Sequence, residues 1–227
     1  MLSFHARRSE FAMTFRASLH SRMARKRRYE KICQLVDLSP EDRVLDVGCG
    51  EGRSFEEFNG ANEIVGLDLN PEQSIFQDNF RFVHGDASSM EFFVDREFDV
   101  VICVGVLERV IPFYNLQRAA REIARVGKAY AVVVPHLLTP IDPYSHLPLW
   151  QLFPRNFRHF SRRWGLTAHF QSGIVDSGEE RIFYLRAKDW QKLFPGSKIL
   201  PFRFAAGGLV LDAIIYKRRP ERDPEED

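Results

Sequence analysis

The clearest structural signal in the chain is the stretch Val44-Leu45-Asp46-Val47-Gly48-Cys49-Gly50-Glu51-Gly52. Its apolar start predicts a buried parallel strand, and its three alternating glycines predict a tight turn after that strand. Glycine has no Cβ, so a ligand can approach the backbone of such a turn closely. The stretch therefore predicts a strand and a turn that hold a nucleotide-like cofactor.

A second predicted strand narrows the class of cofactor. The apolar run Ile64 to Leu67 ends in Asp68, 22 residues after Asp46. In nucleotide-binding βαβ units, a carboxylate at an offset of about 20 residues meets the ribose hydroxyls, whereas it would repel a phosphate. The dinucleotide pattern G-x-G-x-x-G is not met, because Arg53 occupies the position of its third glycine. This argues against a nicotinamide-dependent enzyme.

These residues resemble a known family. The motif from Asp46 to Gly52 looks like the first motif of class I S-adenosylmethionine-dependent methyltransferases. The resemblance continues in order from about residue 40 to residue 135, and it implies S-adenosylmethionine as the cofactor. The later blocks that carry it are Gly85-Asp86-Ala87, Phe98 to Cys103, Val106 to Val110 and Arg121 to Val126.

The resemblance also implies which residues bind the cofactor. Asp68 matches the acidic residue that binds the ribose, and Asp86 matches the one that faces the adenine amino group. Taken alone, Asp86 is better explained as a turn or cap residue. The implied set is Asp46, Gly48, Cys49, Gly50, Gly52, Asp68, Leu69, Asp86, Ala87 and Val104.

Strands that alternate with helices predict a Rossmann-like, doubly wound α/β fold. We expect a seven-stranded, mostly parallel sheet with an antiparallel last strand, as the family resemblance implies. The expected strands are residues 43–47, 63–68, 81–84, 99–103, 129–135, 198–204 and 209–217, and the expected helices lie near residues 114–126 and 190–194. Gly207-Gly208 predicts a hairpin between the last two strands.

The chain divides into three expected parts. Residues 1–40 are expected to form a basic helical arm and a lead-in helix, residues 41–217 the methyltransferase domain, and residues 218–227 a disordered tail. Within the domain, residues 136–186 are too long for a simple connection and are rich in proline, aromatic residues and arginine. We expect this segment to be an inserted lid that selects the methyl acceptor; a structural cap explains it equally well.

The charge of the chain is nearly balanced at +1, but its first 31 residues contain nine Lys and Arg against Glu10 and Glu30. Such an arm could contact an anionic surface such as a lipid, an RNA or an acidic substrate. The favoured alternative is a solvated helix that leads into the domain, with Ile32, Leu35 and Val36 packed on the sheet.

Composition predicts one soluble domain. The apolar runs are too short to span a membrane, and residues 1–8 lack the apolar core of a secretory leader. Cys33, Cys49 and Cys103 have neither metal nor disulfide spacing, so we expect buried thiols, no metal and a cytoplasmic location.

Methyl transfer from a sulfonium needs a general base only where the acceptor carries a proton at working pH. Many relatives have a Leu-Glu-His turn after the fourth strand, whereas this chain has Leu107-Glu108-Arg109. Arginine cannot act as a base at neutral pH, although it could bind an acceptor carboxylate or phosphate. The candidate catalytic residues that remain are His136, His146 and Tyr144, with Asp142 nearby.

His136 is the best placed of these candidates, because it directly follows the predicted fifth strand. A hydrogen-bonded hinge between strand and lid explains this histidine slightly better than a catalytic role does. The fourth strand is followed by Val104-Gly105-Val106 rather than the Asn/Asp-Pro-Pro-aromatic motif of DNA amino-methylating enzymes, so no DNA is expected. The preferred function is methyl transfer to a small-molecule or lipid-like acceptor. The alternative is a non-catalytic relative that binds the cofactor or a partner.

Overall fold

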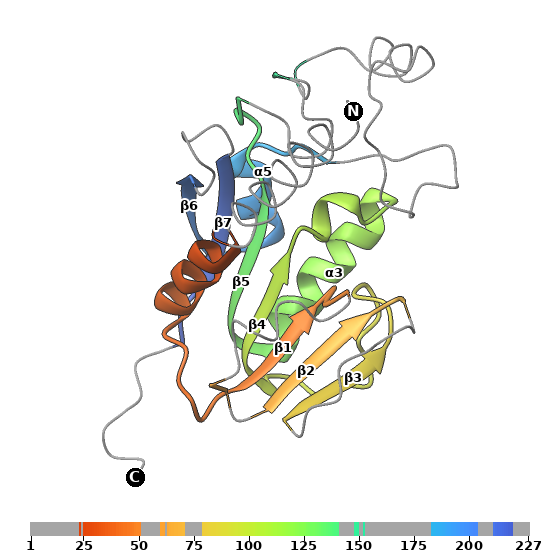
Figure 1. Ribbon diagram of the computed structural model, residues 1–227. Helices are drawn as coiled ribbons and strands as arrows, with labels where there is room; N and C mark the ends of the chain where they lie inside the picture. The colour runs from red at the N-terminus through yellow and green to blue at the C-terminus, as the bar shows by residue number, and fades with distance from the viewer. Residues whose placement is uncertain are drawn as a thin grey trace, which may run out of the picture.

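The computed structural model describes residues 23, 25–50, 60–61, 63–70, 79–140, 148–149, 152, 183–203 and 211–219. Its centre is a seven-stranded sheet of order β3-β2-β1-β4-β5-β7-β6 (Figure 1). The strands are β1 Arg43–Val47, β2 Glu63–Asp68, β3 Phe80–His84, β4 Phe98–Val104, β5 Gly127–Pro135, β6 Lys198–Arg203 and β7 Leu211–Lys217.

The direction of the strands confirms the expected fold class. β1 to β5 are parallel neighbours, and β7 pairs antiparallel with both β5 and β6. The strand order reverses at β1, where β2 and β4 lie on its two sides. The last two strands pair as the hairpin prediction requires; residues 204–210, with the predicted turn, lie outside the described residues.

The strand bounds follow the apolar runs closely. β1 and β2 begin and end at the predicted residues, and β3 and β4 begin one residue earlier, at Phe80 and Phe98. β5 begins at Gly127, two residues earlier than predicted. A Cβ on Gly127 would lie 2.6 Å from a side-chain atom of Val101, so the strand can run this close to β4 only with glycine.

Helix α3 (Phe113–Val126) connects β4 to β5, after the 3-10 turn η1 (Leu107–Arg109). It begins one residue before the predicted start. Its apolar positions recur at helical spacing and are buried: Leu116, Ala119, Ala120, Ile123 and Val126. In its last turn, the Arg125 guanidinium donates to the carbonyl oxygens of Met90 and Phe93, which ties the end of the helix to the loop before β4.

Helix α5 (Ala187–Leu193) is longer at its start than predicted. Ala187 and Lys188 have high helix propensity, and Asp189 lies in the first turn, where a negative charge is favoured. The helix buries Trp190 on the same face of the sheet as α3. α3 and α5 together cover one face of the sheet and form one of its two core layers.

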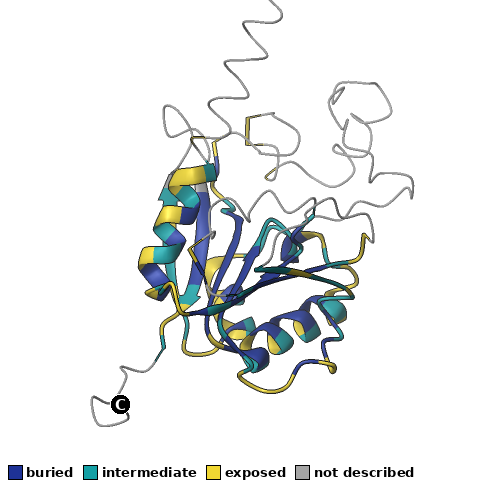
Figure 2. Ribbon diagram, turned by 60° about the horizontal axis from the view of Figure 1, so that its bottom comes forward, coloured by how far each residue is buried: buried dark blue, intermediate teal, exposed yellow. Residues whose placement is uncertain are grey.

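A helix over residues 25–36, called the N-terminal helix below, covers the opposite face of the sheet. Ile32, Leu35 and Val36 are buried there, as the lead-in interpretation predicts. The rest of the basic arm, residues 1–22 and 24, lies outside the described residues. Figure 2 shows the result: dark blue strands between helices whose outer faces are yellow.

Among the helices that the structure describes, none is long and apolar enough to cross a membrane.

Candidate functional site

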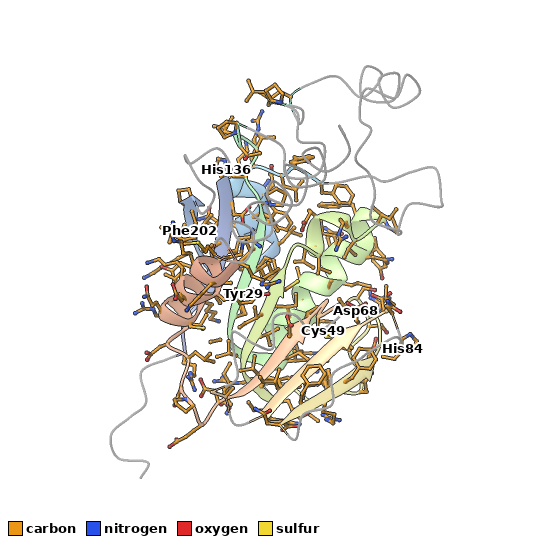
Figure 3. All side chains as sticks on the ribbon, viewed as in Figure 1. Tyr29, Cys49, Asp68, His84, His136 and Phe202 are labelled. Atoms are coloured by element: carbon orange, nitrogen blue, oxygen red, sulfur yellow. The ribbon has the colours of Figure 1, made fainter. Side chains whose placement is uncertain are left out.

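The parallel strands all end at one side of the sheet, called the carboxyl edge here; the opposite side is the amino edge. β7 is antiparallel, so its first residues also lie at the carboxyl edge, where Asp212 pairs with Pro135 of β5. Figure 3 shows Cys49, Asp68, His84 and His136 at the ends of their strands on this edge. In open α/β sheets, ligands bind outside this edge where the strand order reverses.

The turn after β1 lies against the end of β2. The Gly48 and Cys49 N–H groups donate to the Leu67 carbonyl oxygen at 2.7 and 3.3 Å. The Gly50 N–H then donates to Asp68 Oδ2 at 2.8 Å, and the Asn70 N–H donates to Asp68 Oδ1 at 2.8 Å. The Asp68 carboxylate is therefore fixed beside the glycine turn, and each of its oxygens can accept a further hydrogen bond.

The two described glycines of the turn have different roles. Both have positive φ, +76° at Gly48 and +54° at Gly50. A Cβ on Gly48 would collide with the Val106 side chain, so this glycine permits the approach of the loop after β4. Among the described residues, a Cβ on Gly50 would meet nothing within 4 Å. The described part of the chain thus leaves open space at Gly50, next to the Asp68 carboxylate.

The charged and sulfur-bearing side chains of the turn are enclosed. Asp46 is buried at the end of β1, between Gly66 of β2 and Ile102 of β4. Burial, and then the nearby charges of Asp46 and Asp68, raise the pKa of Cys49 to about 12. Cys49 is therefore a protonated thiol at neutral pH and no nucleophile.

The other two thiols differ in burial. Cys103 is fully buried, and burial also raises its pKa. Cys33 was predicted to be buried but is only partly so, on the flank of the N-terminal helix.

The remaining implied cofactor residues lie along the same edge. Asp86 Oδ1 accepts the Ser88 N–H at 2.7 Å, which is the turn arrangement weighed for it. Ala87 and Val104 are partly buried, and the Leu69 side chain is exposed. Gly52 lies outside the described residues, as do the catalytic candidates Tyr144 and His146.

The turn after β4 brings two unlike side chains to the site. Glu108 is completely buried, and a Cβ on Gly105 would lie 3.8 Å from its Oε1 atom. Arg109, the residue at the position of the usual histidine, is exposed. The Glu108 carbonyl oxygen accepts the Phe183 N–H at 2.7 Å, so a described part of the expected lid is joined to η1.

His136 follows β5 and is partly buried. Its Nδ1 accepts the Leu138 N–H at 3.0 Å, so Nδ1 is unprotonated and the neutral ring carries its proton on Nε2. Burial lowers the pKa of His136, which favours this neutral form. The Nδ1 lone pair, which a general base would use, already accepts a hydrogen bond from the turn after β5. This is the arrangement expected of a hydrogen-bonded hinge. The catalytic role of His136 stays a prediction.

Asp212, which was not among the predicted site residues, is also buried at the carboxyl edge. Its Oδ2 forms an ion pair with the Arg28 guanidinium of the N-terminal helix at 3.1 Å. Burial raises the pKa of Asp212 to about 7, with a further contribution from the Glu108 charge, although Arg28 opposes it. The available signal was one acidic residue within the apolar run Leu211 to Ile215.

These features suit one kind of ligand. The space that the described residues leave at Gly50, beside a carboxylate that the Gly50 and Asn70 N–H groups position, can hold a nucleoside with a free ribose diol. Among the described residues, no group of three or more His, Cys, Asp or Glu side chains could hold a metal ion.

Comparison with known proteins agrees with this geometry. Residues 45–134 match the family model of a methyltransferase domain. A sterol 24-C-methyltransferase from Gibberella zeae is 31% identical over 139 residues, covering 56% of this chain and 34% of that protein. A thiol S-methyltransferase from Homo sapiens is 29% identical over 128 residues, covering 51% of each. The chain thus spans about a third to a half of the length of these curated relatives.

A solved structure shares the fold. The 1,6-didemethyltoxoflavin-N1-methyltransferase of Burkholderia thailandensis, bound to its namesake ligand and S-adenosylhomocysteine, superposes with a TM-score of 0.55 at 17% identity. The superposition covers 93% of this chain and 87% of that one. The matched domain over residues 45–134, the strand order and the cofactor-type turn together support a class I S-adenosylmethionine-dependent methyltransferase domain, and the match implies S-adenosylmethionine as the cofactor.

Proposed function

We propose that this chain transfers a methyl group from S-adenosylmethionine to a small-molecule or lipid-like acceptor. The observation that carries the proposal is the Asp68 carboxylate, which the Gly50 N–H holds beside open space at the turn after β1. When bound, the cofactor supplies a methyl group bonded to a sulfonium sulfur, and the neutral thioether that remains after transfer is an excellent leaving group.

The residues of the turn fit that cofactor. Asp68 would accept hydrogen bonds from both ribose hydroxyls, while Gly48, Cys49 and Gly50 would face the cofactor with backbone atoms. A side chain at Gly50 would occupy the open space instead. Asp86, Ala87, Leu69 and Val104 would complete the contacts along the edge of the sheet.

Positioning and the exclusion of water can supply much of the rate acceleration for such a displacement. The chain would position the acceptor between η1 and the residues after β5, where Arg109 could bind an acidic group on the acceptor. The expected lid over residues 136–186 is proposed to cover this space. A sterol and a thiol acceptor are suggested by the names of the relatives.

The first experiment is isothermal titration calorimetry with S-adenosylmethionine, S-adenosylhomocysteine and NAD in parallel. Micromolar binding of the two sulfur compounds without NAD binding supports the cofactor site. Methyl transfer is then measured with radiolabelled S-adenosylmethionine against two probe classes, a sterol and an aliphatic thiol. Binding of NAD alone would contradict the proposal.

A second candidate function rests on Arg109 and His136. An exposed arginine stands at the place of the usual histidine, and the Nδ1 lone pair of His136 is already occupied. Both observations suit a protein that binds the cofactor or a partner without catalysis. Tight S-adenosylhomocysteine binding with no transfer to either probe class would favour it.

A further inference from the structure

The turn η1, the residues that follow it and the outer face of α3 expose apolar and cationic side chains. Ile111, Phe113 and Tyr114 are 43%, 42% and 59% exposed. Three arginines accompany them along the chain: Arg109, Arg118 and Arg121. We call these six residues the η1–α3 surface.

The solvent-accessible charged residues between residues 109 and 121 are all arginines, although the exposed Glu91 carboxylate lies against Arg118. Between residues 104 and 121 the sequence contains one acidic residue, Glu108, and that side chain is completely buried. The first turn of α3 has no acidic residue. Arg118 forms an ion pair with Glu91 at 3.2 Å, but both of these side chains are solvent-accessible, so water and salt screen the pair.

The aromatic and cationic groups are arranged together rather than scattered. The Arg118 guanidinium lies 5.9 Å from the centroid of the Tyr114 ring. The Phe113 ring packs edge-on against Phe183 at 5.6 Å, which holds it in place while much of it stays exposed. The surface thus presents two neighbouring aromatic residues, one of them beside the Arg118 guanidinium.

This combination matches the interface of an anionic lipid bilayer. Tyrosine and arginine both have an apolar body and a polar end, so they lie with the body among acyl chains and the end among head groups. Each arginine near such a surface contributes about 1 kcal/mol of attraction. An RNA would suit the arginines and rings, but the aliphatic Ile111 side chain offers it neither stacking nor charge.

We propose that the η1–α3 surface docks this chain on an anionic lipid bilayer. The docked chain would hold its carboxyl edge at the membrane, since Val106 of the same connection contacts the cofactor turn at Gly48. This goes beyond the proposed methyl transfer, because vesicle binding can be measured whether or not the chain is an enzyme. That the bilayer supplies a lipid-like acceptor rests on the proposed function.

Co-sedimentation with phosphatidylcholine vesicles, with and without phosphatidylglycerol, tests the proposal on the full chain. We expect binding to the anionic vesicles that weakens as salt is added. Tyr114→Ser should lower the partition coefficient about fivefold, through lost apolar burial. Arg109→Gln should lower it about fivefold on anionic vesicles and leave neutral vesicles unaffected.

The chain offers matched controls at the amino edge. Val94 is 68% exposed and lies beside residues that contact Arg125 at the end of α3. Val94→Ser removes an exposed apolar group, and Lys217→Gln at the end of β7 removes one exposed charge. Neither should change vesicle binding. S-adenosylhomocysteine titration of each variant checks folding and reports separately on the cofactor site.

Three outcomes would overturn the proposal. The first is no wild-type binding to either vesicle, and the second is an equal loss in the amino-edge controls. The third is Tyr114-dependent binding of an RNA oligonucleotide, or Tyr114-dependent dimerisation, in a chain that ignores vesicles. Loss of S-adenosylhomocysteine binding with vesicle binding intact would count against the proposed function alone.

Discussion

The two edges of the sheet use charged residues in opposite ways. At the amino edge, acidic and basic side chains meet in pairs that span several strands. At the carboxyl edge, the acidic groups Asp46, Asp68 and Glu108 are fixed by backbone N–H groups or enclosed, beside glycines with positive φ. The difference indicates which edge maintains the fold and which edge serves the ligand.

The amino edge is held by a network of ion pairs. Arg43 of β1 bonds Glu63 of β2 and Glu97 before β4, and Asp99 of β4 bonds Lys128 of β5 at 2.8 Å. Burial lowers the pKa of Arg43, but its two glutamate partners outweigh this and raise it. Burial likewise raises the pKa of Asp99, but the hydrogen bonds from Arg43 N and Lys128 outweigh burial and lower it. Both shifts mean that the charged forms are stabilised in the fold.

At the carboxyl edge, the fold of the chain disfavours the charged form of Asp212 instead. Its pKa is raised to about 7 mainly by burial, despite the ion pair with Arg28. Asp42 makes the matching comparison at the amino edge, since it is also buried and paired with an arginine, Arg219, at 2.6 and 2.7 Å. One aspartate–arginine pair is bidentate and well satisfied; the other leaves its carboxylate partly uncompensated.

The largest expected effect is at Gly50. Gly50→Val should weaken S-adenosylhomocysteine binding at least about a hundredfold, because the side chain fills the space beside Asp68. Gly196 is the control, with φ +75°, the same open surroundings and a place at the amino edge before β6. Gly196→Val should lose a similar stability, about 1–3 kcal/mol, and bind normally by calorimetry. Normal binding by folded Gly50→Val would mean that the turn faces elsewhere.

The next effect tests the amino edge itself. Asp42→Asn should lower the free energy of unfolding by about 2–3 kcal/mol, because it removes the buried charge that pairs with the partly buried Arg219 guanidinium. Urea unfolding at pH 8 measures this, with Asp212→Asn as the matched variant. A loss at Asp212 as large as the loss at Asp42 would erase the distinction between the edges.

Asp68→Ala should affect the ligand rather than the fold. The lost charge-assisted hydrogen bonds are worth roughly 1.5–3 kcal/mol, which lowers S-adenosylhomocysteine affinity by about one to two decades. Calorimetry measures the change, and Asp99→Ala at the amino edge serves as the control with unchanged affinity. An unaltered dissociation constant for Asp68→Ala would remove Asp68 from the site.

The smallest effect concerns pH. Because the folded pKa of Asp212 lies above its unfolded value, the folded state keeps a proton that the unfolded state has lost, and stability falls as pH rises towards about 7. Between about pH 6 and about pH 7, the wild type should lose on the order of 1 kcal/mol relative to Asp212→Asn. Parallel pH series of urea unfolding report the difference; identical slopes would show that Asp212 does not titrate there.

Much of the fold could be predicted from local sequence. β1 and β2 were predicted to the residue, because each is an apolar run with an aspartate at or next to its end, followed by a glycine-rich or loop sequence. The starts of β5 and α5 were predicted two and three residues too late, because Gly127 is set by its close approach to Val101 and Ala187 carries no apolar signal. Local sequence did not give the position of β7 between β5 and β6; the family resemblance implied only its direction.

Part of the site could likewise be predicted from local sequence, and part could not. The juxtaposition of Asp68 and Gly50 could be predicted, because parallel strands must bring their carboxyl ends together. The enclosed Asp212 could not, because its partner Arg28 belongs to a segment 184 residues earlier in the chain and no local pattern joins them. The roles of Tyr144, His146 and the cytoplasmic location stay predictions.

The aspartate–arginine pairs also constrain how the chain is made. The N-terminal helix leaves the ribosome early, yet Asp212 contacts it through Arg28, and the Arg218 side chain donates to the Leu35 carbonyl oxygen at 2.9 Å. At typical synthesis rates, these partners emerge roughly ten to forty seconds after the helix. Docking of the first described helix is therefore completed only when the last described strand has been translated, and a nascent chain that stalls before β7 leaves that helix without these contacts.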